Sequence, residues 1–253
     1  MNGLAKKYGL ATQYYANTHP SIGNHLGLTT GADHDNNDSF NKTVTADNVV
    51  RDLLAAGKTW TAYEESLPRV DYTSPDIGNY VRRYCPLSYF SDVINSSTQK
   101  LSLVPFTQFK ADLANNAWPN YSFMTPNLCN DAHDCSLGTA DSWLKTNIDS
   151  LVKSASLQNG GLLIIVLDEA ANHNSHGGGQ VAWVAISPKY SKGGLQIHYA
   201  VSTPEYAALD AGRSRAEALS RKRQERNEHV RIFQVAGASA TQHGDYWIVN
   251  IRK

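Results

Sequence analysis

Residues 161–170 read GLLIIVLDEA, and this stretch decides the fold. Its continuous apolar run, 162–167, is typical of a strand that is buried on both faces of a parallel sheet. Two acids, Asp168 and Glu169, follow at the carboxyl end of that strand. Adjacent carboxylates leaving a buried strand repel each other unless a cation or a basic group lies between them. One interpretation of the pair is therefore a cation site, and the other is two acids that meet the dipole of a helix start.

Around this strand the chain alternates strand and helix patterns. Strand candidates are LATQYYAN at 10–17, WTAYEES at 60–66, YSFMTPN at 121–127 and QVAWVAISP at 180–188. Helical spacing predicts helices over 3–9, 45–57, 106–119 and 139–160, with Thr45 or Asp47 and Thr139 as caps. Residues 31–43 and 68–100 read as a surface loop and a long connection. Strands separated by helices predict an α/β sheet with helices on both faces, whose ligands bind beyond the carboxyl ends of the strands.

The composition gives no overall electrostatic drive toward nucleic acid or an anionic membrane, because Lys+Arg and Asp+Glu number 23 each. No stretch approaches the ~18 apolar residues of a membrane span, and the start, MNGLAKKYGLATQYY, lacks the apolar core of a signal peptide. Of the three cysteines, Cys129 and Cys135 are close enough in sequence to close a small loop in an oxidising compartment. Three reduced thiols, Cys85 included, are the alternative.

A hydroxyl residue on a tight turn is the next candidate for chemistry. THPSIGNHLGLTTG, residues 18–31, predicts a turn through His19-Pro20-Ser21 and then a helix. A serine at a helix start gains from the positive end of the dipole, and Asn24 is placed to donate to a phosphate oxygen beside it. The simpler interpretation is that Ser21 only caps the helix.

Two further polar clusters follow strand candidates. NDAHDC, residues 130–135, combines Asp131, His133 and Asp134, which suit a metal held by carboxylate and imidazole, although such triplets also occur in ordinary loops. His173 and His176 precede a run of glycines at 177–179 and either contact phosphate or are simply exposed. A parallel sheet brings the clusters after its strands to one rim, and together they describe a metallophosphoesterase.

The character of the chain changes after about residue 195. We expect residues 196–253 to be a divergent tail with a charged helix and a possible edge strand in DYWIVNIRK. The basic stretch 213–226 is interpreted as a solvated helix, with a nucleic-acid-binding arm as the alternative. We expect no nucleic-acid partner, because the net charge is zero.

Three segments of the chain resemble a known family. THPSIGNHLGLTTG, then LVPFTQFKADLANNAWPNYSFMTPNLCNDAHDCSLGTADSWLKTNI, and then GLLIIVLDE with GGGQVAWVAISPK are similar to the bacterial phosphoesterase family of acid phosphatases and phospholipases C. That family lies within the alkaline phosphatase superfamily, and the resemblance covers about residues 2–194. It implies an alkaline-phosphatase-like α/β sandwich with a mostly parallel central sheet, in a catalytic domain over 1–195.

The resemblance also implies a mechanism and a set of site residues. Ser21 would attack phosphorus and form a phosphoserine intermediate, and Asn24 would steady the phosphoryl oxygens. Asp168 and Glu169 would hold a divalent metal ion, with further metal or phosphate contacts from Asp131 and His133. The substrate would be a small phosphate ester.

The chain departs from the family pattern at both ends. The family has an earlier strand that ends in an acid and an asparagine, and we expect that amino-terminal strand to be missing. Family members are usually periplasmic or secreted. The expected activity is phosphate monoester hydrolysis, and the alternatives are a phospholipase C-like phosphodiesterase or a truncated, inactive relative.

Overall fold

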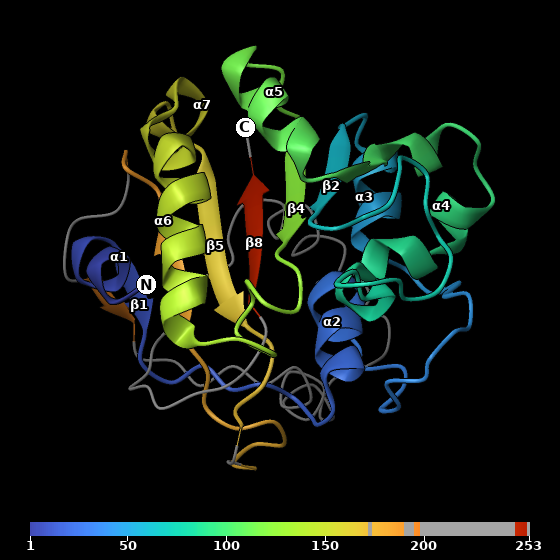
Figure 1. The fold of residues 1–253 in the computed structure, drawn as a ribbon, viewed down its shortest axis with the longest axis horizontal. Coiled ribbons are helices and arrows are strands. Elements are labelled where there is room, and N and C mark those ends of the chain that lie inside the picture. The colour runs from blue at the N-terminus through green and yellow to red at the C-terminus, as the bar shows by residue number, and fades with distance from the viewer. Residues whose placement is uncertain (172–173, 190–194, 198–245, 252–253) are drawn as a thin grey trace, which may run out of the picture.

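The computed structural model describes residues 1–171, 174–189, 195–197 and 246–251, the last two ranges as backbone. Among these residues one mixed sheet contains eight strands in the order β3-β2-β4-β8-β5-β6-β1-β7 (Figure 1). The strands are β1 (Gly9–Ala11), β2 (Trp60–Glu64), β3 (Leu103–Pro105), β4 (Tyr121–Thr125), β5 (Leu162–Leu167), β6 (Trp183–Ile186), β7 (Leu195–Ile197) and β8 (Tyr246–Ile251).

Most strands of this sheet run in one direction. β2 pairs in parallel with both β3 and β4, and β1 pairs in parallel with β7. β8 is antiparallel to both β4 and β5, so those two strands run the same way. Only β6 and β8 oppose the other described strands. The expectation of a mostly parallel α/β sheet is therefore confirmed.

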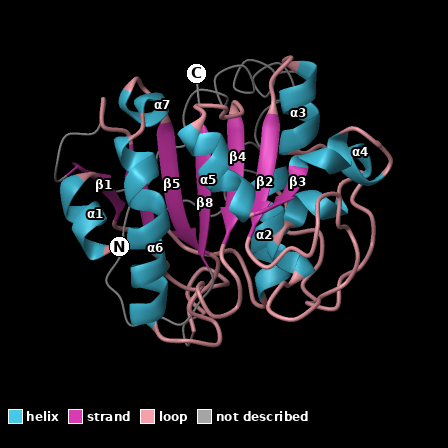
Figure 2. Ribbon diagram, turned by 45° about the horizontal axis from the view of Figure 1, so that its top comes forward, coloured by secondary structure: helices cyan, strands magenta, loops and turns pink. Residues whose placement is uncertain are grey.

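Helices cover both faces of the sheet, as expected (Figure 2). The α-helices are α1 (Asn2–Lys7), α2 (Ser21–Thr30), α3 (Val49–Ala55), α4 (Ser91–Ile94), α5 (Thr107–Ala114), α6 (Leu137–Lys153) and α7 (Ala155–Gln158). Two 3-10 turns, η1 (Arg82–Tyr84) and η2 (Pro86–Tyr89), lie in the long connection 68–100, and a third, η3 (Gln99–Ser102), begins at its end. None of the described helices has the length and apolar character needed to cross a membrane.

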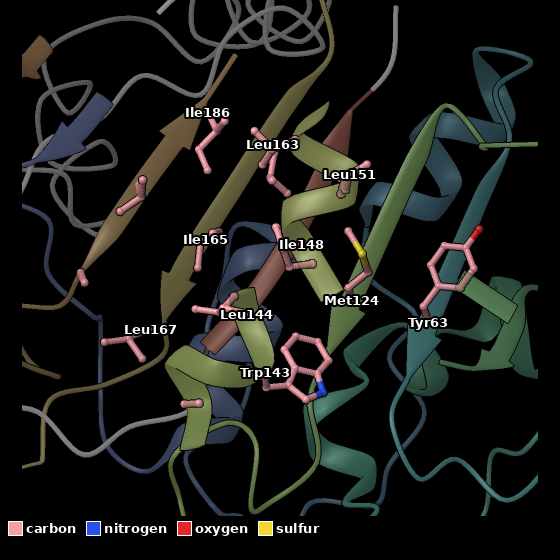
Figure 3. Close-up of a cluster of buried hydrophobic side chains, with 14 of the residues drawn as sticks. Tyr63, Met124, Trp143, Leu144, Ile148, Leu151, Leu163, Ile165, Leu167 and Ile186 are labelled. Atoms are coloured by element: carbon pink, nitrogen blue, oxygen red, sulfur yellow. The ribbon is translucent and has the colours of Figure 1, made fainter. Parts of the chain in front are cut away.

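Alternating side chains of the strands build two cores. On one face, Ile148 and Leu151 of α6 pack over Leu163 and Ile165 of β5 (Figure 3). On the other face, Ile164 packs in the core that includes α2, α3 and the 3-10 turns. The apolar run of β5 thus has one set of side chains for each core, which is why it carries no polar alternation.

Some details differ from the sequence-based expectations. Asn48 caps α3 and Ser136 caps α6, in place of the expected Thr45 or Asp47 and Thr139, because these residues lie directly before the first helical turn and accept from its amides. The short strand β3 was not predicted. The expected strand near the carboxyl end exists as β8, but the prediction that it lies at an edge was wrong, since β4 and β5 pair with it on both sides.

The expected charged helix and the basic stretch 213–226 lie outside the described residues.

Candidate functional site

The site lies where several strands end. β2, β4 and β5 run in the same direction, so their carboxyl ends meet at one rim of the sheet. Asp168 and Glu169 follow β5 at this rim, and α2 begins there at Ser21. The hydroxyl of Ser21 donates a hydrogen bond to Oε1 of Glu169, with 3.3 Å between the oxygens. Residues 148 positions apart thus meet at one point.

Glu169 is held from a second side by a histidine. Nδ1 of His19 lies 2.9 Å from Oε2 of Glu169, so the carboxylate bridges the imidazole and the Ser21 hydroxyl. Ser21 is 5% exposed, whereas about a third of the His19 side chain reaches solvent. The group is therefore buried at the serine and open at the histidine, as a site that receives a ligand from solvent requires.

Asp168 lies deeper than its neighbour. Its side chain is fully buried, and Oδ2 lies 3.5 Å from Nε2 of His25, which is also fully buried. His25 follows Ser21 by one turn of α2, so both side chains lie on the same face of the helix. The His25 ring stacks on the Tyr84 ring, with 5.2 Å between the centroids.

Burial dominates the electrostatics of the site. It raises the pKa of Asp168 to about 7, helped by the charge of Glu169, while the Ser21 hydroxyl opposes the shift. It also raises the pKa of Glu169, and the charge and hydrogen bond of His19 oppose that shift. Burial lowers the pKa of His25 well below its usual value, so His25 is neutral near pH 7.

Asn24 serves the turn before Ser21 in this structure. Its Oδ1 accepts from the backbone amides of Asn17 and Thr18, at 2.8 Å and 3.2 Å, and its Nδ2 donates to the Thr18 carbonyl at 2.8 Å. The side chain therefore fixes the backbone that leads into Ser21. Its contact with a phosphoryl oxygen stays a prediction.

Asp131 and His133 lie on the loop after β4, beside the site. Asp131 is buried and its Oδ1 accepts from the backbone amide of His133, whose ring is about half exposed and lies 2.7 Å from a carboxylate oxygen of Asp134. The His133 ring is 6.5 Å from the Tyr84 ring, which also stacks with the His25 ring at 5.2 Å. Tyr84 thus contacts both His133 and the histidine that faces Asp168.

A disulfide and a set of hydrogen bonds to Glu65 hold the loop after β4. A disulfide joins Cys129 and Cys135, which confirms the alternative in which these two pair, and Cys85 remains a buried thiol. Glu65, at the end of β2, accepts from the Asn127 amide, the Asn130 side chain and Nε1 of Trp143. The loop therefore has a rigid base.

The glycine run 177–179 packs against the backbone that precedes Ser21. The amide of Gly178 donates to Ala16, and its carbonyl accepts from Ala170. A Cβ on Gly177 would lie 1.8 Å from the Asn17 carbonyl oxygen, so no side chain fits. The glycines thus allow the close approach that brings residues 16–18 beside the end of β5. His176 is exposed, and its ring is tilted against the Tyr15 ring with 4.0 Å between the centroids, whereas His173 lies outside the described residues.

The residues at the site fit a cation in part. Both carboxylate oxygens of Asp168 are buried and accept no hydrogen bond of normal geometry from the described residues, which suits a carboxylate that binds a metal ion. In the same part of the chain, no three His, Cys, Asp or Glu side chains gather as a metal-binding group. Asp168 and Glu169 are therefore candidate ligands for a divalent metal ion, and Asp131 and His133 do not join them in this structure.

Sequence reasoning missed two residues that contact the acids, His19 and His25. A signal for both was available, because His19 lies in the same turn as Ser21 and His25 follows Ser21 at helical spacing.

Comparison with known proteins shows the family of the chain. The model of the phosphoesterase family matches residues 1–200, most of the chain. The chain belongs to the phosphoesterase family. It is 33% identical to an acid phosphatase of Aspergillus fumigatus over 186 residues, which is 69% of this chain and 41% of that protein. It is 32% identical to a phosphatidylinositol-3-phosphatase of Mycobacterium tuberculosis over 67% of this chain and 55% of that protein.

A probable acid phosphatase of Kluyveromyces lactis is 30% identical over 67% of this chain and 42% of that protein. This phosphoesterase chain thus spans about half the length of the curated relatives it matches. The relatives come from fungi as well as a bacterium, so the expectation of a bacterial family stays unconfirmed.

Proposed function

We propose that the chain hydrolyses phosphate monoesters, with Ser21 as the nucleophile. The observation that carries this proposal is the hydrogen bond from the Ser21 hydroxyl to Glu169, at the start of a helix and on the rim where the strands end. Glu169 accepts the hydrogen bond of the serine hydroxyl and is therefore placed to take its proton. The dipole of α2 favours negative charge at Ser21.

The reaction proceeds in two displacements at phosphorus. The Ser21 proton passes to Glu169 as the bond from Oγ to phosphorus forms, and His19 holds the carboxylate in place. The bond from phosphorus to the alcohol oxygen breaks, and that oxygen takes the proton from Glu169. Water then attacks phosphorus, the bond to Ser21 breaks, one proton returns to Oγ, and inorganic phosphate leaves.

A divalent metal ion belongs to the proposal, with Asp168 and Glu169 as the residues that would hold it. The buried, unsatisfied oxygens of Asp168 support this. When bound, such an ion would neutralise charge on the phosphoryl oxygens and lower the pKa of the serine hydroxyl. Contacts from Asp131 and His133 to the metal ion or the phosphate, and from Asn24 to the phosphate, stay part of the proposal.

The names of the relatives support a monoester substrate, because the protein of Mycobacterium tuberculosis is named for removing a phosphate from the 3 position of a phosphatidylinositol. The fungal relatives are named as acid phosphatases. A location outside the cytosol also fits, since the disulfide between Cys129 and Cys135 is typical of oxidising compartments.

The test is hydrolysis of p-nitrophenyl phosphate by the purified chain, with and without a chelator. We expect turnover that the chelator reduces, and a loss of about a thousandfold or more in Ser21→Ala. Ser156→Ala is the matched control, because Ser156 is a buried serine that bonds Asn116 away from the site. Acid-quenched protein should carry phosphate on Ser21 by mass spectrometry.

Three results would contradict the proposal in different ways. Turnover of bis(p-nitrophenyl) phosphate in preference to the monoester would favour a phospholipase C-like diesterase. Equal rates in wild type and Ser21→Ala would remove Ser21 as the nucleophile. A folded wild-type chain with no turnover at any divalent metal would favour an inactive relative.

A further inference from the structure

The first turn of α2 has no cap from its own sequence. Its N-cap residue is Pro20, which has no acceptor in its side chain, and the first turn contains no acid. The missing acceptor comes from another segment, because Oδ1 of Asp38 accepts from the backbone amide of Ile22 at 3.1 Å. Ile22 directly follows Ser21, so this bond fixes the peptide that carries the proposed nucleophile.

Asp38 is held in turn by Arg83 of η1. Nε of Arg83 lies 3.2 Å from the second carboxylate oxygen, Oδ2, so each oxygen of Asp38 has its own partner. The arginine is 17% exposed, and its guanidinium also lies over the Tyr84 ring at 4.9 Å. An arginine that is mostly buried and packed on a ring has a fixed position, so it holds the loop at 31–43 through Asp38.

Tyr84 connects this anchor to the other half of the site. Arg83 lies over the Tyr84 ring, and His25, which faces Asp168, stacks on the same ring. One residue, Arg83, thus supports both the serine and the buried acid of the site.

We propose that Asp38 and Arg83 are positioning residues for Ser21, which hold the first turn of α2 so that the serine hydroxyl stays opposite Glu169. This inference rests on the proposed function. Its physical basis is that a nucleophile must remain within a narrow range of positions, and a displacement of about 1 Å can cost about a hundredfold in rate. Without Asp38 the Ile22 amide loses its acceptor, and the first turn of the helix is free to fray.

The test compares Asp38→Ala, Asp38→Asn and Arg83→Met in the full chain. We expect Asp38→Ala to lower kcat about 10- to 100-fold and to leave KM within about twofold, because the serine is misplaced while the groups that bind phosphate remain. Asp38→Asn should retain most of kcat, since an amide oxygen still accepts from Ile22. The kcat of Arg83→Met should lie between those of Asp38→Ala and Asp38→Asn.

A second ion pair provides the matched control. Asp92 accepts from Arg51 at 2.9 Å and from the side chain of Asn48, which caps α3, so it supports the start of another helix, through the cap residue, away from Ser21. Asp92→Ala should lower stability as Asp38→Ala does and leave kcat unchanged. The independent readout is hydrogen exchange at the Ile22 amide, which should become faster in Asp38→Ala and stay slow in Asp92→Ala.

Wild-type kcat in Asp38→Ala would overturn the proposal, and so would an Ile22 amide that exchanges at the wild-type rate in that variant. An equal loss of kcat in Asp92→Ala would mean that lower stability, and not a misplaced Ser21, explains the loss, and would also overturn the proposal. An inactive wild type would overturn the proposed function alone, because exchange at Ile22 still decides whether Asp38 holds the turn.

Discussion

Replacing Glu64 with glutamine should change how the stability of the protein depends on pH. Glu64 ends β2 and is 2% exposed, and its nearest polar groups are the hydroxyl of Thr125, 3.5 Å away, and the thiol of Cys85. Burial raises its pKa from 4.5 to about 8, while those two neighbours oppose the shift. The folded protein therefore holds a proton on Glu64 that the unfolded chain loses above pH 4.5.

The sign and size of the effect follow from this difference in bound protons. Where the folded state binds more protons, the free energy of unfolding falls as pH rises, so the stability present below pH 4.5 is lost up to about pH 8. Each unit of pH costs about 1.4 kcal/mol while the difference is complete, which gives roughly 3–5 kcal/mol over this window. Glutamine stays neutral at every pH, so Glu64→Gln should lack this part of the slope.

The assay is urea unfolding of wild type and Glu64→Gln at several values between pH 5 and pH 9, followed by tryptophan fluorescence. The difference in the free energy of unfolding between the two proteins reports on Glu64 alone, because Asp168 and Glu169, whose pKa values are also raised, contribute equally to both pH curves. Asp92→Asn is the contrasting variant, because Arg51 lowers the pKa of Asp92 and its effect should be constant across this range. Parallel curves for wild type and Glu64→Gln would refute the reasoning.

Two further predictions concern the framework of the site. Gly178→Ala places a Cβ 2.4 Å from the Thr18 carbonyl oxygen, so thermal unfolding should show that the protein loses about 1–3 kcal/mol of stability. Gly138→Ala in α6, where no atom lies closer than 3.5 Å to the new Cβ, should be neutral or slightly stabilising. Equal losses of stability in the two variants would contradict the packing argument. Glu65→Ala removes the acceptor of the Asn127 amide and of Trp143, so limited proteolysis should cut the loop at 127–136 faster than in wild type. An unchanged rate of cleavage would show that the disulfide alone holds the loop.

Much of the fold was readable from the sequence because local patterns decide it. The apolar run 162–167 coincides with β5, and the single helix predicted over 139–160 is found as α6 followed by the short helix α7. The strand β3 was not predicted, because three residues, Leu103–Pro105, are too few to show an alternating hydrophobic pattern. The central position of β8 was not predicted either, since the pairing of strands depends on segments far apart in the chain.

The site was predictable in its chemistry and less so in its partners. Ser21 and Glu169 were expected at one rim because each lies at the end or start of an element there, and the structure brings them into contact. The roles of Asp38 and Arg83 could not be predicted, because the loop at 31–43 has no pattern that says which of its acids turns inward. Asn24 shows the reverse case, where a residue expected at the ligand is bonded to its own backbone.

The place of β8 between β4 and β5 bears on how the molecule is made. A ribosome delivers residues 121–125 and 162–167 long before residues 246–251, so the hydrogen-bonding edges of β4 and β5 that face each other stay open during synthesis. Contacts of such wide sequence separation form slowly. The nascent chain therefore exposes the edges of β4 and β5 until β8 emerges, and in that interval these edges are open to pairing with other chains.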